Sequence, residues 1–152
     1  MQLGSILESG EFHKVGREVT FHILRTSPEG NQDKARVEAV FHFVDEALRH
    51  EADRHADEWL RNDPLYKKSG IVPADKRREE EFYTFLARAL RDKDDPSQPF
   101  CPLSDYHRLR KALVSDVVTH LLRAYKQYVR DEYPETITDE QAGELVEEAL
   151  GK

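Results

Sequence analysis

Apolar and polar side chains alternate near the start of the chain in the way that β-strands require. Two such runs lie on either side of Gly16-Arg17, within residues 11–25. A two-residue connection that begins with Gly is typical of a type II′ turn, so we predict a β-hairpin over this segment. Because two strands alone are marginal in water, one face of the hairpin should pack on a helical layer. That face consists of Val19, Phe21 and Ile23.

The next apolar positions recur mainly every three or four residues, which is the period of an amphipathic helix. They are Val37, Val40, Phe41, Val44, Leu48, Trp59 and Leu60. We predict one helix from about Asp33 to Arg61. It should end before Pro64, because the residue ahead of a proline is pushed out of the helical region. A loop is expected over residues 65–72.

Two further helices follow on either side of a proline-rich connector. Pro73 suits the first turn of a helix whose apolar face ends in Leu90. Residues 92–102 contain three prolines, which predicts an irregular connection. The helix after it should run from the N-cap residue Ser104 to Tyr133.

The predicted fold is mainly α, with an N-terminal β-hairpin followed by about four amphipathic helices in a small bundle. The fourth helix covers residues 138–150, where Thr138-Asp-Glu-Gln141 matches a capping box. We assign residues 1–134 to one domain that contains the hairpin and the helices. Residues 135–152 are assigned to an acidic C-terminal helix.

The acidic C-terminus carries the whole net charge of the protein. Residues 131–152 hold eight acidic residues and one Lys, a net charge of −7, and the preceding 130 residues hold 22 charges of each sign. This balance argues against nonspecific nucleic-acid binding, which needs a basic field. Residues 105–130 carry six basic and two acidic residues, a net charge of +4. We expect the acidic helix to fold back over this basic segment.

The chain has features of a cytoplasmic protein. It lacks the run of about 18 to 20 apolar residues that a membrane span needs, and its first residues do not resemble a signal peptide. Its single cysteine, Cys101, excludes an intramolecular disulfide and fits a reducing compartment. We therefore expect no membrane association and a location in the cytoplasm.

The sequence contains few candidates for catalysis or metal binding. It has no glycine-rich phosphate loop, dinucleotide fingerprint, nucleophile elbow or paired-histidine zinc helix, so we expect neither enzymatic activity nor a cofactor. His42, Glu46 and His50 have helical spacing, and Asp53 follows closely, which could provide metal ligands. A solvated helix face gives the same pattern, and we expect no metal there.

Cys101 and His107 are the one pair that suggests nucleophilic catalysis, because an imidazolium can activate a thiol. Cys101 lies between Phe100 and Pro102, however, and this setting favours a small buried side chain.

Basic residues concentrate at two places, where aromatic side chains accompany them. The first is Lys76-Arg77-Arg78, and Glu79-Glu80-Glu81 follows it directly. The second contains Arg108, Arg110, Lys111, Arg123, Lys126 and Arg130, together with Tyr106, Tyr125 and Tyr128. Such a mixture can bind nucleic acid, but we favour ion pairing within the chain as its explanation.

A partner surface is predicted at the end of the long helix. If the apolar stripe extends beyond the core, it would form a groove for another protein; the alternative is that these side chains pack in the core. The residues are Trp59, Leu60, Leu65 and Tyr66. The candidate partner-binding residues of the basic segment are Arg108, Lys111, Tyr125 and Tyr128.

The second half of the chain resembles the tail assembly chaperones of long-tailed bacteriophages. The motifs are Phe82-x-x-Phe-Leu-x-x-Ala-Leu, a proline-rich connector, Leu103-Ser-Asp-Tyr-x-x-Leu-Arg, Val117-x-x-x-Leu-Leu-x-x-Tyr-x-x-Tyr and Pro134. Val15-Gly-Arg-Glu-Val-Thr-Phe-His-Ile is similar to the hairpin that many of them carry.

This resemblance implies a non-enzymatic, mainly helical chaperone that binds the tape-measure protein during tail assembly in the host cytoplasm. Other tail proteins are possible partners, and a small chaperone of this kind is expected to form homo-oligomers. A different reading of the same sequence is a helical adaptor or regulator that binds nucleic acid through its basic helix.

Overall fold

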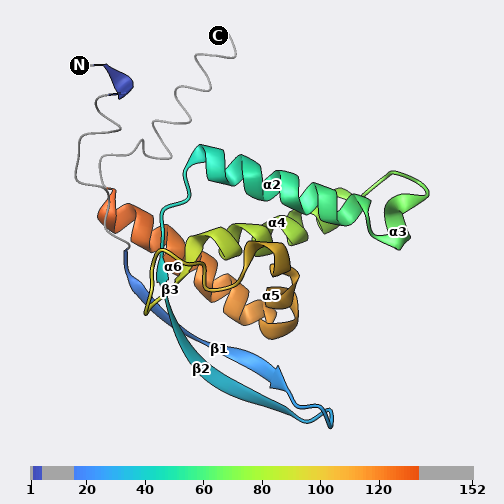
Figure 1. Cartoon of the computed structure of the whole chain (residues 1–152), viewed down its shortest axis with the longest axis horizontal. Coiled ribbons are helices and arrows are strands. Elements are labelled where there is room, and N and C mark those ends of the chain that lie inside the picture. Colours follow the sequence, from blue (N-terminus) through green and yellow to red (C-terminus); the bar gives the residue numbers. More distant parts are fainter. Residues whose placement is uncertain (1, 5–15, 134–152) are drawn as a thin grey trace.

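The computed structural model describes residues 2–4 and 16–133 of the chain. A three-stranded antiparallel sheet carries helices on one of its faces (Figure 1). In chain order the elements are β1 (Glu18–Thr26), β2 (Gln32–Phe41), α2 (Glu46–Arg61), α3 (Pro64–Lys67), α4 (Ala74–Ala89), β3 (Leu90–Asp92), a 3₁₀ turn (Leu103–Asp105), α5 (His107–Ala112) and α6 (Ser115–Glu132). The predicted helix over 138–150 lies outside the described residues.

The expectation of a mainly α fold is wrong. Helix makes up 54% and strand 19% of the described residues, so the fold is α+β. The sheet order is β1-β2-β3, and β3 continues directly from α4, pairing Leu90 with Phe41 of β2. The helices therefore cover a sheet instead of forming a bundle of their own.

The structure contains a hairpin, but it is not the one predicted over residues 11–25, whose first strand falls on residues 11–15, outside the described residues. β1 pairs with β2 in a register that joins Thr26 to Gln32, and the turn between them contains Gly30 with a positive φ of 87°. Gly16 has a different role, because a Cβ atom there would lie 2.0 Å from Cε2 of Tyr128 on α6. Glycine thus permits the close approach of the chain to α6.

The single helix predicted over residues 33–61 is also wrong, because residues 33–45 are not helical. Residues 32–41 form β2, whose inner face carries Ala35, Val37, Ala39 and Phe41. The helix begins at Glu46, where the side chain of Asp45 accepts a hydrogen bond of 2.8 Å from the N–H of Leu48. Its predicted end at Arg61 is confirmed.

The helices after α2 differ from the expectation in three respects. The helix after Pro73 is confirmed as α4, although Leu90 belongs to β3. The predicted helix over 104–133 is broken by Leu113 and Val114, which separate α5 from α6. A four-residue helix, α3, lies at the start of the region that was expected to be a loop.

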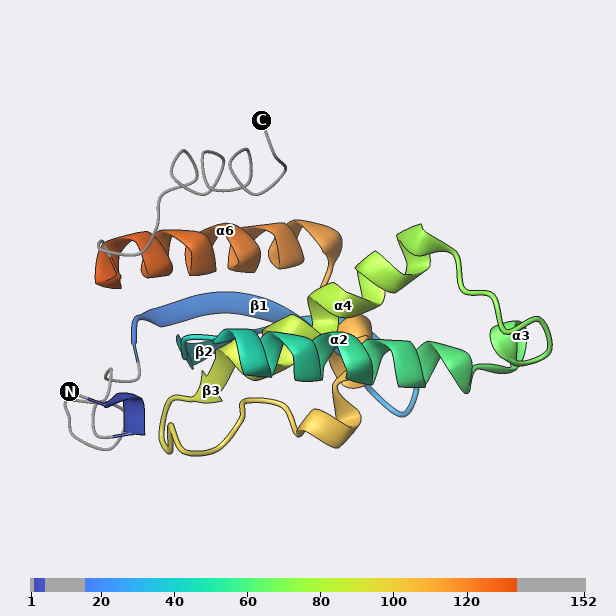
Figure 2. The same ribbon diagram turned by 90° about the horizontal axis from the view of Figure 1, so that it is seen from above.

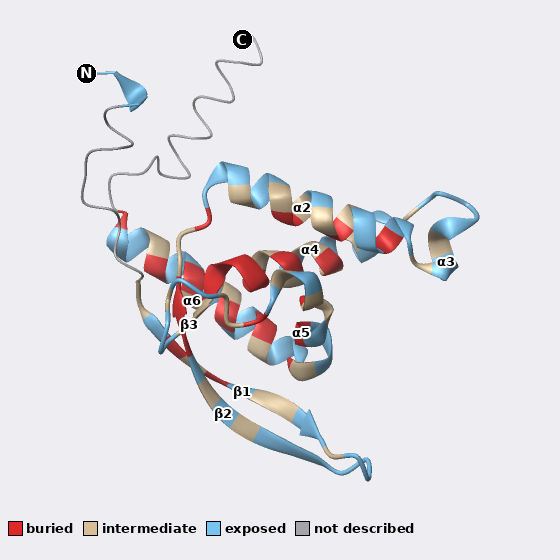
Figure 3. Cartoon of the chain, in the orientation of Figure 1, coloured by how far each residue is buried: buried red, intermediate tan, exposed pale blue. Residues whose placement is uncertain are grey.

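The core lies between the helices and the base of the hairpin (Figure 3). Val19 and Phe21 of β1 are buried there and Ile23 packs against them, as their alternation predicted. Phe41 stacks on Tyr128 and meets the edge of Tyr125, which ties the sheet to α6. Each fully buried side chain of this size contributes about 1.5–3 kcal/mol to folding. The outer end of the hairpin extends beyond this core and is exposed (Figure 3).

Candidate functional site

The predicted groove residues at the end of α2 are divided between core and surface. Leu60 is buried and Tyr66 is half-buried, so neither forms an open groove. Trp59 is 40% exposed and Leu65 is 74% exposed. Ile71, which the sequence analysis did not select, is 73% exposed in the loop after α3. We call Trp59, Leu65 and Ile71 the α3 surface.

The α3 surface lies at a projecting end of the molecule. In Figure 2, α3 and its loop extend from the ends of α2 and α4, far from the sheet. Trp59 lies on α2, where the ring of His107 stacks on it at a centroid distance of 4.5 Å. Leu65 and Ile71 lie on the projecting segment, and exposed apolar side chains of this kind are typical of a binding surface.

The aromatic residues predicted to accompany the basic segment belong to the core. Tyr125 and Tyr128 are 8% and 1% exposed. The hydroxyl of Tyr125 accepts a hydrogen bond of 2.9 Å from the N–H of Val44, and its burial raises its pKa. These tyrosines therefore do not form a surface with Arg108 and Lys111, which are exposed.

Several of the basic residues pair within the chain, which was the alternative left open by the sequence. Arg77 lies 3.5 Å from Asp57 of α2, and Arg108 lies 3.7 Å from Asp105. On α6, Arg123, Lys126 and Arg130 are exposed and have no ion-pair partner among residues 2–4 and 16–133.

The proposed histidine stripe is not formed. His42 precedes α2 in an extended segment, where its N–H bonds to the carbonyl of Ala89, so it does not share a helix with Glu46 and His50. Glu46 and His50 form an exposed pair at 3.3 Å, and Asp53 is half-buried further along α2. Within the described ranges, no three His, Cys, Asp or Glu side chains are grouped to hold a metal ion.

Cys101 and His107 take separate positions. The Cys101 thiol is directed at the carbonyls of Pro102 and Asp105, at 3.7 and 3.5 Å, and burial raises its pKa. His107 stacks on Trp59. A raised pKa keeps the thiol protonated, which is the opposite of what a cysteine nucleophile needs.

A buried polar junction, which the sequence analysis missed, joins α4 to α5. Glu80 is 1% exposed and accepts hydrogen bonds of 2.6 Å from the Tyr106 hydroxyl and from Arg110. Arg110 also donates to Glu79. Burial, followed by the hydrogen bond to Glu80, raises the pKa of Tyr106 strongly. Spacing could have revealed this junction, because Glu80 shares one helix face with the buried Thr84 and Ala87.

A second polar group joins α4 to α2. Arg88 is 4% exposed; it lies 3.3 Å from Glu51 and 3.3 Å from Nδ1 of His55, and it donates to the carbonyl of Thr84. Burial, followed by the charge of Arg88, lowers the pKa of His55. Both groups pair charges between packed helices, which is a structural role, although Nε of Arg88 has no hydrogen-bond partner among the described residues.

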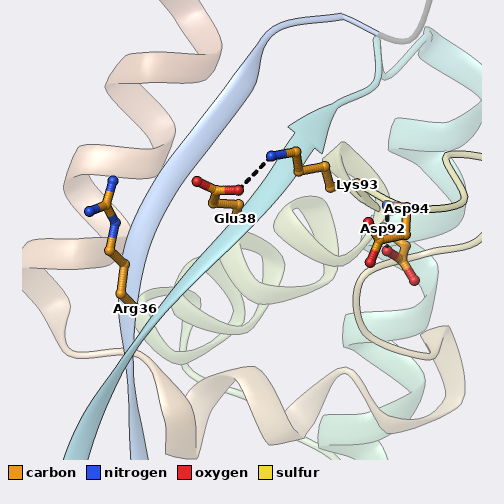
Figure 4. Close-up of a pocket in the computed structure, with 5 residues that line it drawn as sticks. All are labelled: Arg36, Glu38, Asp92, Lys93 and Asp94. Atoms are coloured by element: carbon orange, nitrogen blue, oxygen red, sulfur yellow. Dashed lines mark hydrogen bonds and ion pairs between the residues drawn. The ribbon is translucent and has the colours of Figure 1, made fainter.

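An open polar pocket lies on the outer side of the sheet (Figure 4). It is lined by Arg36, Glu38, Asp92, Lys93 and Asp94. Lys93 bonds to Glu38 at 2.6 Å, which raises the pKa of the amine and lowers the pKa of the carboxyl. Asp92 accepts from the N–H of Asp94. These contacts fasten the connector after β3 to the hairpin.

Comparisons with known proteins give no relative to this chain. No family model, curated protein or solved structure matches it. In the part of the chain that the structure describes, no helix is both long enough and apolar enough to cross a bilayer.

Proposed function

We propose that this chain is a non-enzymatic chaperone that holds the tape-measure protein during bacteriophage tail assembly in the host cytoplasm. The observation that carries the proposal is the α3 surface, where Leu65 and Ile71 are about three-quarters exposed on a projecting end. A long apolar client needs such a surface, which buries client side chains without enclosing them. The resemblance of the helical motifs to tail assembly chaperones supports the choice of client.

The test measures binding of the full chain to a purified tape-measure fragment. We expect the double variant Leu65→Ser, Ile71→Ser to bind at least about tenfold more weakly, since burial of one aliphatic side chain contributes about 1.5–3 kcal/mol. Both side chains are exposed, so the variant should fold normally.

The matched control is Val114→Thr, which changes another exposed apolar residue, at the start of α6. It should bind the fragment as the unmodified chain does. Equal binding by the double variant would show that the α3 surface is not the client site. No binding by the unmodified chain would contradict the proposed function itself.

A second candidate function is an adaptor that binds nucleic acid through α6. One observation favours it: within the described residues, the exposed side chains of Arg123, Lys126 and Arg130 form no ion pair. Three phosphate contacts would give a salt slope of about −2.7 for duplex DNA, since each contact contributes about −0.9. A mobility-shift titration at several salt concentrations measures this slope.

A further inference from the structure

One face of α6 is a basic stripe with no described partner. Arg123, Lys126 and Arg130 are three and four residues apart, which places them on the same side of the helix. The buried residues Leu121, Tyr125 and Tyr128 occupy the opposite side. Figure 2 shows α6 as an outer layer, with β1, α4 and α2 all on the same side of it.

The nearest acidic residues of α6 are already engaged or distant. Asp131 lies 2.7 Å from Arg17 and accepts a hydrogen bond from Gln127, and Glu132 lies 4.0 Å from Arg17. Asp116 is near the other end of the helix, seven residues before Arg123. The stripe is therefore available to an acidic ligand.

We propose that residues 135–148 of the same chain bind to this stripe. The segment contains six acidic residues and no basic one; they are Glu135, Asp139, Glu140, Glu144, Glu147 and Glu148. It begins three residues after the end of α6, so it can turn back beside the helix that precedes it.

The charges of the two segments are complementary. The stripe from Arg123 to Arg130 carries three cations and is about 10 Å long at about 1.5 Å per residue. Residues 135–148 carry six carboxylates within fourteen positions, so any part of the segment that reaches the stripe brings carboxylates to it.

The covalent link of this segment to α6 favours its binding over that of other acidic ligands. Exposed ion pairs are individually weak and are screened by salt. A short tether raises the effective concentration of the segment to about the millimolar range, which favours it over a free protein or nucleic acid at lower concentration. The basic stripe is thus covered by the chain itself, and the inference does not depend on the proposed chaperone function.

The test is zero-length carbodiimide cross-linking of the full chain, followed by mass spectrometry. This reaction joins a lysine amine to a carboxylate that it contacts. We expect cross-links from Lys126 to carboxylates of the acidic segment. Lys93 and Glu38, which lie 2.6 Å apart, provide an internal control that the reaction worked. A mixture of isotope-labelled and unlabelled chains separates links within a chain from links between chains.

Two variants identify the cause. Arg123→Gln, Arg130→Gln keeps the reactive amine of Lys126 but removes the flanking charges, and the yield of its cross-links should fall at least about fivefold. The same drop is expected between about 0.05 M and about 1 M salt, where the screening length shrinks to about 3 Å. The control Arg36→Gln, Arg108→Gln removes equal charge elsewhere and should leave the yield unchanged.

Three results would overturn the inference. One is the absence of links from Lys126 while Lys93 and Glu38 are joined. Another is a set of links found between chains only, which would mean that a second copy supplies the segment. The last is duplex DNA binding by the unmodified chain at about 0.15 M salt that Arg123→Gln, Arg130→Gln abolishes, because the stripe would then be open to nucleic acid.

Discussion

Glu80 shows how one buried carboxylate can connect two helices. It lies on α4 and accepts hydrogen bonds from the hydroxyl of Tyr106 and the guanidinium of Arg110. Tyr106 is the N-cap residue of α5, and Arg110 lies within α5. Both of its oxygens are satisfied, so the charge is stable at 1% exposure. The run of three glutamates hid this role in the sequence, where a charged run is most often a solvated face.

Glu80→Gln should destabilise the fold. The amide keeps the shape of the side chain but removes the charge that accepts from Arg110, and its NH2 group cannot accept a hydrogen bond. We expect a loss of about 2 kcal/mol in the free energy of unfolding, measured by urea denaturation. Glu79→Gln is the control, because Glu79 is 43% exposed and should cost less than about 1 kcal/mol. Equal effects of the two changes would contradict a special role for Glu80.

His55 should make the folded state less stable as the pH falls below 6.5. Burial and the charge of Arg88 lower its pKa below the usual value of 6.5, so the folded chain binds fewer protons on His55 than the unfolded chain does. The stability that the neutral ring contributes is therefore complete above 6.5 and is lost as the pH falls through 6.5 towards the folded pKa.

The measurement compares urea midpoints of the unmodified chain and His55→Gln across this range. We expect the unmodified chain to lose more stability on acidification than the variant does. Burial also lowers the pKa of His42. Because His42 is present in both proteins, the difference between their pH profiles reports His55 alone. Parallel pH profiles would show that His55 has the same proton affinity in both states.

At the scale of elements, the sequence predicted the helices better than the sheet. The end of α2 and the start of α4 follow from prolines, which act locally. The second strand was missed because Val37, Val40, Phe41 and Val44 also fit a helical period. Its inner face includes two alanines, Ala35 and Ala39, whose small side chains give a weak alternating signal.

The role of Gly16 could not be read from the sequence for a different reason. A glycine beside strand residues suggests a turn, but here it makes room for Tyr128, a residue more than a hundred positions away. Of the predicted groove residues, Trp59 and Leu65 are exposed, Tyr66 is half-buried and Leu60 is buried. The sequence could not separate them, because the burial of Leu60 depends on the contact of α2 with α4.

The start of α6 offers a test of helix capping. Val114 occupies the N-cap position with extended backbone angles, φ −80° and ψ 156°, but it has no side-chain acceptor for the first N–H groups. Val114→Thr has nearly the same shape and adds a hydroxyl at that place. We expect a gain of about 0.5–1 kcal/mol in the free energy of unfolding. Val114→Ala, which adds no acceptor, should give no gain; an equal gain would mean that the effect is not capping.

At the scale of the whole molecule, α4 is the centre of the fold. It packs against α2, α5, α6 and β3, and its buried residues include both polar junctions. The elements that project from this centre are the outer part of the hairpin and the α3 surface (Figures 1 and 2). Leu65 and Ile71 of the α3 surface are about three-quarters exposed, so these two side chains can be changed without disturbing the core.

The same surface should drive self-association when no client is present. Exposed apolar side chains on identical chains can bury one another in a symmetric dimer, and this is a common arrangement for small proteins. Sedimentation of the 17.7 kDa chain should therefore show a mass that rises with concentration towards a dimer or a larger ring.

The double variant Leu65→Ser, Ile71→Ser should weaken this association at least about tenfold, whereas Val114→Thr should not. Because client and second copy would compete for one surface, added tape-measure fragment should release monomers. A monomer at every concentration would contradict this prediction, and a dimer that the fragment does not disturb would place the contact between copies elsewhere on the molecule.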